Sequence, residues 1–256
     1  MRIKTTMDVL CALTAATSID ETWKIATDHL ATLGFARINY GYTRFRHQRS
    51  IGDPDDALFL TTCSNDYVQA YFDSGFYART PIFRWAERNT GACTWKWVRE
   101  AMEKGELCPE EQAAVLKNKE IGIKAGITVS FLASSIRSKG AIGLIADPGL
   151  SEEDVEKIFV TLGKDIIVLA NMMHLRILQL PQLSRTRALS PRQREALEWV
   201  ADGKTTQDVA LLMGVSTAMV EKHLRLAREA LAVETTAQAV AKSTALNMIF
   251  NQPHQG

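Results

Sequence analysis

Hydrophobic residues recur at helical spacing through the last quarter of the chain. A shorter apolar helix is expected at 206–213, and a longer one at 217–231, with the tight turn Gly214-Val215-Ser216 between them. The longer segment carries one apolar stripe, made of Val220, Leu224, Ala227 and Leu231. Two short helices joined by a glycine-containing turn predict a helix-turn-helix, whose second helix enters the DNA major groove.

Two further helices complete this region. Ser190 and Gln193 have the spacing of a capping box, and Pro191 stands at the first helical position, so a helix is expected to begin there and to end at Gly203. An alanine-rich helix is expected to begin at Thr235 or Thr236. Four helices in about 65 residues predict a small all-α domain.

The N-terminal part alternates helical and period-two patterns. Strands are expected at 35–45, 57–62, 127–133 and 141–146, and helices after Ser18, at 65–73, at 109–123 and from Ser151. This order predicts an α+β fold, with an N-terminal α/β/α sandwich around one antiparallel sheet and a C-terminal four-helix helix-turn-helix domain. The predicted boundaries are 1–178 for a sensor domain, 179–188 for a linker and 189–256 for the helical domain.

Composition narrows the class of protein. A chain of 256 residues with net charge +1 is long enough for two cores and is no strong polyelectrolyte. Its four cysteines are scattered, which favours reduced thiols. Asp8 interrupts the apolar N-terminal stretch, and no uninterrupted apolar run reaches membrane-spanning length. We therefore expect a cytoplasmic protein without a membrane partner.

Charge alone does not indicate DNA binding in the helical domain. Seven basic and seven acidic residues between 189 and 256 give a net charge of zero. The inference of DNA binding therefore depends on the motif and on the placement of the basic side chains.

The helical domain resembles the DNA-binding domain of the LuxR family. The matching positions are Leu189-Ser190-Pro191, Leu197, Gly203-Lys204-Thr205, Ala210, Gly214-Val215-Ser216, Val220, His223-Leu224, Leu231 and Ala239-Val240-Ala241. The resemblance implies a homodimer on double-stranded DNA, with contacts from Lys204, Thr205, Thr206, Thr217, Glu221, Lys222, Arg225 and Arg228. We expect Arg225 to contact a base and Lys204, Thr206, Lys222 and Arg228 to contact phosphates.

This domain departs from the family pattern at two positions. Glu221 stands where the family commonly has Lys or Arg, and Ala218 stands where many members have a polar or larger residue. Glu221 is able to accept a hydrogen bond from a cytosine amino group or to weaken the attraction to phosphates.

Aromatic residues in the middle of the N-terminal part give a second signal. Tyr67 and Tyr71 share one helix face, and Thr80-Pro81 and Trp95 follow. Such a pair is most often plain core, but the order and spacing resemble the autoinducer-binding domain of LuxR-type quorum-sensing regulators over roughly residues 5–175. The resemblance implies a ligand site made of Cys63, Tyr67, Tyr71, Thr80, Trp95 and Gly143.

Four of these positions depart from the family. Thr80 replaces an Asp that accepts the amide N–H of an acyl-homoserine lactone, and Tyr67 replaces a Trp that donates to the lactone carbonyl. Cys63 replaces a Tyr, and Gly143 replaces a Ser or Thr. A lost charge-assisted hydrogen bond in a buried site is worth about 1.5–3 kcal/mol, or about one to two decades of affinity. The ligand is thus an acyl-homoserine lactone, another small signal molecule, or none, and no cofactor is expected.

Two rival classes fit less well. The five histidines (His29, His47, His174, His223 and His254) have no ligand spacing, and no GxSxG or P-loop is present, so an enzyme is not expected. A phosphorylated response regulator needs an Asp at the end of a central strand, and the predicted strand 127–133 has none. A LuxR-type regulator that needs no ligand, acting through N-terminal dimerisation or protein partners, stays open. The candidate dimer surfaces are the helix from Ser151 and the last helix around Val240 and Leu246.

Overall fold

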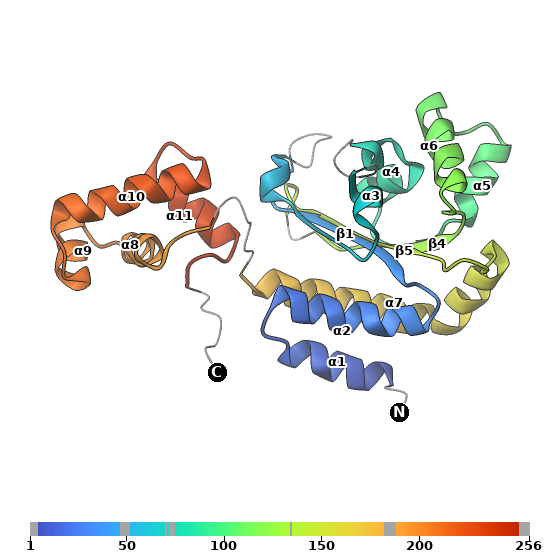
Figure 1. The fold of residues 1–256 in the computed structure, drawn as a ribbon, viewed down its shortest axis with the longest axis horizontal. Coiled ribbons are helices and arrows are strands. Elements are labelled where there is room, and N and C mark those ends of the chain that lie inside the picture. The colour runs from blue at the N-terminus through green and yellow to red at the C-terminus, as the bar shows by residue number, and fades with distance from the viewer. Residues whose placement is uncertain are drawn as a thin grey trace. The chain divides into compact units, whose positions relative to one another are not determined.

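In the computed structural model, the described residues are 5–46, 52–69, 71, 75–133, 135–181 and 188–250. The chain forms two compact units, one of Met1–Ala16 with Asp20–Arg176 and one of Thr17–Ile19 with Ile177–Gly256. Most of the predicted linker, residues 182–187, lies outside the described residues. Figure 1 follows the elements of each unit along the chain.

A five-stranded antiparallel sheet is the centre of the larger unit. Its strands are β1 (Arg37–Thr43), β2 (Leu58–Thr61), β3 (Gly91–Thr94), β4 (Gly126–Ser130) and β5 (Lys139–Ile145), in the order β2-β1-β5-β4-β3. In this register Gly143 of β5 lies opposite Asn39 of β1 on one side and Thr128 of β4 on the other. The central strand therefore brings together residues that are far apart in the sequence.

Three helices cover one face of the sheet: α1 (Thr6–Ala15), α2 (Ile19–Thr32) and α7 (Glu152–Gln179) (Figure 1). β1 alternates, and its buried Ile38, Tyr40 and Tyr42 face this layer. The Tyr40 hydroxyl and His174 Nδ1 of α7 lie 2.9 Å apart in a hydrogen bond. The His174 ring stacks on Phe131 with ring centroids 4.0 Å apart.

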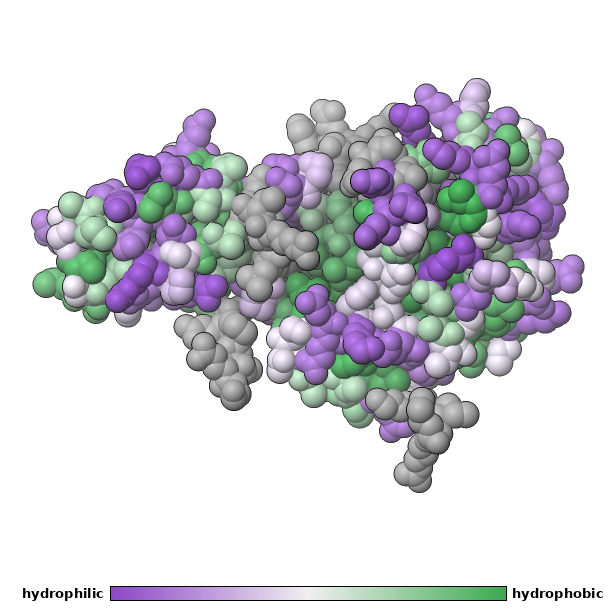
Figure 2. All heavy atoms as spheres, in the orientation of Figure 1, coloured by the Kyte–Doolittle hydropathy of each residue, from purple (hydrophilic) through white to green (hydrophobic). Residues whose placement is uncertain are grey.

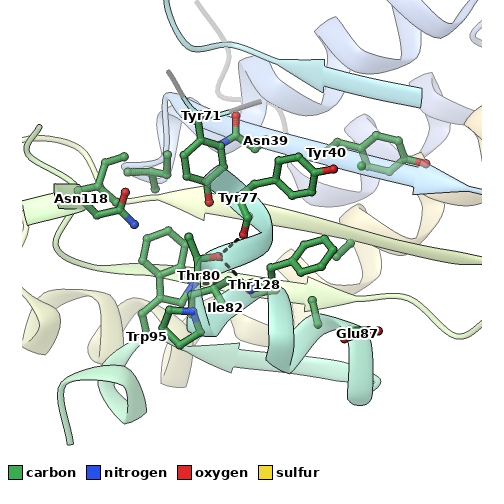
Figure 3. A pocket seen from close by; sticks show the side chains of 18 of the residues that line it. Asn39, Tyr40, Tyr71, Tyr77, Thr80, Ile82, Glu87, Trp95, Asn118 and Thr128 are labelled. Carbon is green, nitrogen blue, oxygen red and sulfur yellow. Dashed lines mark hydrogen bonds between the residues drawn. The ribbon is translucent and has the colours of Figure 1, made fainter. Parts of the chain in front are cut away.

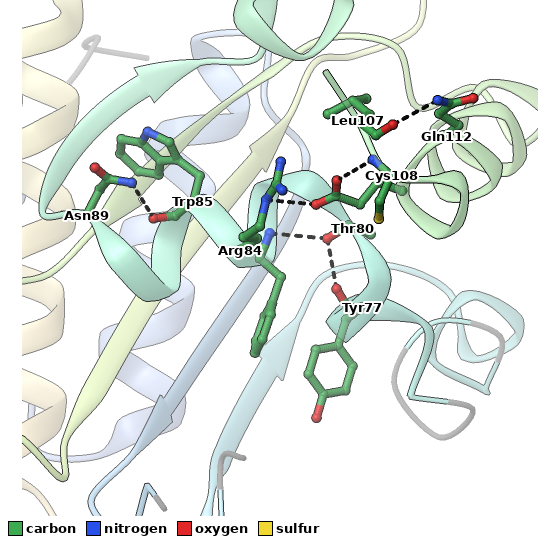
Figure 4. Close-up of polar contacts among 10 residues, drawn as sticks. Tyr77, Thr80, Arg84, Trp85, Asn89, Leu107, Cys108 and Gln112 are labelled. Carbon is green, nitrogen blue, oxygen red and sulfur yellow. Dashed lines mark hydrogen bonds and ion pairs between the residues drawn. The ribbon is translucent and has the colours of Figure 1, made fainter. Parts of the chain in front are cut away.

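Shorter helices cover the other face. They are α3 (Asn65–Val68), the 3₁₀ turn η3 (Phe76–Arg79), α4 (Pro81–Arg88), α5 (Lys96–Glu103) and α6 (Pro109–Glu120), and a further turn η1 (Pro54–Asp56) precedes β2. Arg84 of α4 pairs with the nearly buried Glu111 of α6 at 2.8 Å, and Glu111 also accepts from the backbone of Cys108 (Figure 4). Hydrophilic side chains cover the outer surface of α5 and α6 in Figure 2.

The predicted α/β/α sandwich is confirmed, with differences in detail. The sequence analysis did not predict α1, α4, β3 or α5, of which α4, β3 and α5 have eight residues or fewer. The predicted strand 127–133 ends early, at Ser130, and the predicted helix 65–73 is represented by α3, with residues 70 and 72–74 outside the described part. Short elements depend on tertiary contacts more than on local pattern.

The long helix α7 is the most apolar helix of the described part of the chain that reaches membrane-spanning length. By length and composition alone, α7 would be able to cross a membrane, because its most apolar 18-residue segment has a mean hydropathy of 1.5. Of that segment, 33% is buried within the described structure. The sequence reasoning counted only uninterrupted apolar runs, and Lys164 and Asp165 interrupt this one. Ile166, Leu169 and Met173 of α7 are fully buried in this unit, as in the core helix of a globular domain.

The smaller unit contains the four predicted helices, α8 (Pro191–Ala201), α9 (Thr206–Met213), α10 (Thr217–Leu231) and α11 (Thr236–Ala245). Each begins at a side chain that caps its first turn, namely Ser190, Thr205, Ser216 and Thr235. Gly214 ends α9 in the left-handed conformation, at φ 65°, which glycine adopts without strain. Val220, Leu224, Ala227 and Leu231 form the buried stripe of α10, as the spacing predicted.

Candidate functional sites

A cavity of about 200 Å³ lies between the sheet and the layer of short helices (Figure 3). β1, β4 and β5 form its floor, and α3, α4, α5 and α6 contribute side chains to its walls and roof. Its polar and aromatic lining includes Asn39, Tyr67, Tyr71, Tyr77, Thr80, Trp95, Asn118 and Thr128. Apolar and aromatic walls with a few polar groups are typical of a small-molecule site.

The structure brings together five of the six residues that the sequence assigned to the ligand. Tyr67, Tyr71, Thr80, Trp95 and Gly143 all line this cavity. Cys63 does not line it, although it lies four residues before Tyr67. Burial raises the pKa of the Cys63 thiol, which therefore stays protonated at neutral pH.

Thr80 is placed by its role as the N-cap of α4. Its Oγ1 accepts from the backbone N–H of Phe83 at 3.2 Å and donates to the backbone carbonyl of Tyr77 at 2.8 Å (Figures 3 and 4). The residue is 2% exposed. A hydroxyl in this position satisfies the end of the helix and the preceding turn together.

A chain of hydrogen bonds continues from Thr80 along the cavity wall. Tyr71 hydrogen-bonds both Thr80 and Tyr67, and the Tyr67 and Tyr71 rings stack with centroids 4.9 Å apart. Asn39 Nδ2 of β1 donates to the Tyr67 hydroxyl at 2.9 Å, and Thr61 of β2 donates to Asn39 Oδ1 at 2.7 Å. The hydroxyls at this end of the cavity are thus bound to one another.

The tyrosine hydroxyls inside the cavity are uncharged. Burial raises the pKa of Tyr67 and of Tyr71, so both phenols stay protonated at neutral pH. Among the described residues, the charged members of the lining are two ion pairs, Arg46 with Glu87 at 2.9 Å and Arg99 with Glu152 at 2.6 Å, and three lysines, Lys119, Lys124 and Lys139. Lys119 and Lys124 are exposed, and Lys139 donates to the backbone carbonyl of Asn89. A neutral ligand suits the protonated tyrosine end of the cavity because an unpaired charge would be costly to bury.

Trp95 lies across the sheet floor, at the start of α5. Its indole N–H donates to Thr128 Oγ1 at 2.8 Å. Its ring leaves no room for a side chain at Gly126, where an added Cβ would come within 2.9 Å of it. At Gly143 an added Cβ would lie 3.9 Å from the Trp95 ring, which is an ordinary contact distance. Packing against Trp95 therefore does not require glycine at position 143.

The polar residues of the cavity that the sequence did not predict include Asn39, Asn118 and Thr128. Asn39 and Thr128 were detectable, because each alternates with core residues along a predicted strand. Asn118 belongs to the polar helix α6, and nothing in its local sequence distinguishes the face that meets the cavity.

The second candidate site is the exposed face of α10. Thr217, Glu221 and Arg225 are spaced by four residues and are exposed on a face that flanks the buried stripe, and Lys222 is exposed beside them. Lys204 and Thr205 lie at the start of α9, and Thr205 caps that helix. An exposed helix face with basic and polar side chains fits the major groove.

Several of these side chains already have partners. Thr206 donates to Glu221 at 3.1 Å, which joins α9 to α10. Arg225 pairs with Glu229 one turn further along the same helix, and Arg228 donates to Thr236 Oγ1 of α11 at 2.9 Å. Arg228 therefore has a structural contact that the sequence did not predict, while Lys204 and Lys222 extend from the surface.

Two family models match the chain. The autoinducer binding domain matches residues 18–177, and sigma-70, region 4, matches residues 174–231. The first match contains the sheet and the cavity, and the second contains α8, α9 and α10.

Full-length relatives agree with these matches. The quorum sensing-dependent transcriptional regulator VjbR of Brucella abortus is 25% identical over 87% of this chain and 88% of its own length. The transcriptional activator TraR of Agrobacterium vitis is 25% identical over 90% of this chain and 94% of its own length.

Solved structures show the same fold. SdiA in complex with octanoyl-rac-glycerol has a TM-score of 0.53 at 16% identity, over 96% of each chain; SdiA is an Escherichia coli protein. The LuxR-family factor CepR2 of Burkholderia cenocepacia has a TM-score of 0.50 at 17% identity, over 67% of this chain and 92% of its own.

Proposed function

Because this chain belongs to the LuxR family of quorum-sensing transcriptional regulators with an autoinducer-binding domain, we propose that its cavity binds one small neutral signal molecule and that α10 reads DNA. The observation that carries the first part is the cavity of about 200 Å³, with its aromatic walls and its protonated tyrosine hydroxyls. Tyr67, Tyr71 and Trp95 provide ring surfaces for an acyl or aryl group.

Arg225 is the proposed base-reading residue of α10. It is exposed in the middle of the helix, and its ion pair with Glu229 lies on the surface, where such pairs contribute little. A guanidinium that exchanges this partner for guanine would form a bidentate contact. Lys204, Lys222 and the threonines at the start of α9 and α10 are proposed as phosphate contacts.

The regulator is proposed to act as a homodimer through α7. Three apolar side chains on the face of α7 opposite the sheet are exposed: Val160 at 85%, Val168 at 49% and Leu175 at 54%. Their spacing of eight and seven residues keeps them on one stripe of the helix, as in a helix–helix contact between subunits. Dimers allow two recognition helices to read two half-sites.

The proposed setting is the cytoplasm, where a regulator reaches DNA, and the proposed role is binding without catalysis. Curated relatives along nearly the whole length are transcriptional regulators, which supports this role. A second candidate is a regulator that needs no ligand. The hydrogen-bond chain from Asn39 to Thr80 favours that candidate in part, since it stabilises the roof of the cavity without any ligand.

Two measurements on the full chain test the proposal. Selection from randomised duplex DNA, followed by footprinting, should yield a two-fold site. A thermal-unfolding panel of neutral compounds, including N-acyl-homoserine lactones and 1-octanoylglycerol, should contain at least one that raises the melting temperature. Failure to select any sequence would overturn DNA reading. A panel without any stabilising compound would overturn the ligand and leave the ligand-independent regulator.

A further inference from the structure

One hydroxyl on the floor of the cavity has its proton available. Thr128 is 1% exposed, lines the cavity and accepts a hydrogen bond from the Trp95 indole at 2.8 Å. An indole N–H only donates, so this bond uses a lone pair of Thr128 and leaves its O–H. Within the described part of the chain, no acceptor lies within hydrogen-bonding distance of that O–H.

A second polar group of the cavity lies on α6. The side-chain oxygen of Asn118, on α6, is buried and has no hydrogen-bond partner among the residues that the structure describes. Figure 3 shows its carboxamide among the side chains that line the cavity. A buried acceptor without a partner is unfavourable, and a donor on a bound ligand would remove that cost.

The hydroxyl groups of the opposite wall, those of Tyr67, Tyr71 and Thr80, are already hydrogen-bonded within the protein. The Tyr77 carbonyl only accepts, so Thr80 donates its proton to it, and Tyr71 is hydrogen-bonded to Thr80. Tyr67 donates to Tyr71, while Asn39 donates to Tyr67. The hydroxyl protons of Tyr67 and Thr80 are therefore used within the protein.

We propose that Thr128 and Asn118, and not the Tyr67–Tyr71–Thr80 wall, make the polar contacts to the signal molecule. This inference depends on the proposed function of the cavity and names its ligand class. The ligand is a neutral acyl compound with a carbonyl that accepts from Thr128 O–H and a hydroxyl that donates to Asn118 Oδ1. The apolar acyl group lies against Trp95 and the tyrosine rings.

Isothermal titration of the full chain with two probes tests the assignment. The probes are 1-octanoylglycerol, which has an ester carbonyl and hydroxyls, and methyl octanoate, which has the carbonyl alone. The unmodified protein should bind 1-octanoylglycerol about tenfold more tightly. Asn118→Leu should abolish that preference by weakening only 1-octanoylglycerol. Thr128→Val should weaken both probes about tenfold.

A matched variant separates ligand contact from fold. Thr128→Val also removes the acceptor of the Trp95 indole, whereas Thr128→Ser keeps the hydroxyl and should keep most of the affinity for both probes. Equal affinity of the two probes, or unchanged affinity after Thr128→Val, would overturn the assignment. Failure of both probes to bind would overturn the ligand class, while a stabilising compound elsewhere in the wider panel would leave the proposed function standing.

Discussion

The exposed face of α10 and the cavity under α4 use polar side chains in opposite ways. On α10, Lys222 and Arg225 extend into solvent, and the single partner of Arg225 is a surface carboxylate. In the cavity, Tyr71 and Thr80 are bound within a chain of hydrogen bonds. A DNA-binding face is thus recognisable residue by residue. The ability of a buried site to hydrogen-bond a ligand depends on which of its polar groups already have partners within the protein.

A change in the packing of the sheet should alter the cavity and leave the α10 face unaffected, and a change on α10 should alter DNA binding without altering the cavity.

The largest effect is expected from Gly126→Ala. The added methyl group would collide with the backbone carbonyl of Leu144 and approach the Trp95 ring to 2.9 Å. We expect the free energy of unfolding of the larger unit to fall by about 2–4 kcal/mol, measured by chemical denaturation. Gly143→Ala is the matched control, because its methyl group has space, and it should change stability by less than about 1 kcal/mol.

The next effect concerns pH. Burial, and then the charge of Arg44, lower the pKa of His174 from 6.5 to about 4. Between about pH 4 and pH 6.5 the unfolded chain therefore binds a proton at this histidine that the folded chain does not bind. The contribution of His174 to the free energy of unfolding is constant above about pH 6.5 and falls as the pH drops toward 4. The loss should be on the order of 2–3 kcal/mol.

Chemical denaturation between pH 7 and pH 4 measures this loss, with His174→Gln as the comparison. The variant should be less stable than the unmodified protein at pH 7, because the ring stack on Phe131 is lost. The difference should shrink toward pH 4. A difference that stays constant across the range would contradict a neutral buried histidine.

On the DNA side, Arg225→Ala should remove about 1–3 kcal/mol of discrimination at one base pair. Lys222→Ala should weaken all sequences alike and flatten the dependence of affinity on salt. Glu229→Ala frees Arg225 from its surface partner and should leave sequence preference intact. Competition binding with single-base variants of the selected site distinguishes these outcomes, and a uniform loss in both Arg225→Ala and Lys222→Ala would refute base reading by Arg225.

The smallest expected effect is on assembly. Val168→Glu, on the exposed stripe of α7, should raise the dimer dissociation constant at least about tenfold, since a carboxylate would be buried without a partner. Leu116→Glu is the control, because Leu116 is similarly exposed on α6, outside the proposed interface. Analytical ultracentrifugation measures both variants, and equal shifts would remove α7 from the interface.

The helical unit was largely predictable from sequence because its signals are local. Ser190, Thr205, Ser216 and Thr235 lie directly before the helices that they cap. The cavity was predictable only through its resemblance to a family, and then incompletely. The alternation along the strand marks Thr128 as a polar position between core residues, but its pairing opposite Gly143 and its bond to Trp95 depend on the fold.

Thr80 stands where the resemblance to the autoinducer-binding domain implies a carboxylate, and thermal unfolding with a lactone tests how this residue affects ligand choice. With N-octanoyl-homoserine lactone at low micromolar concentration, the unmodified full chain should show almost no rise in melting temperature. Thr80→Asp, which restores an acceptor for the amide N–H, should show a clear rise of several degrees. A rise of many degrees in the unmodified protein would contradict the account, because the cavity would then accept the amide without the carboxylate.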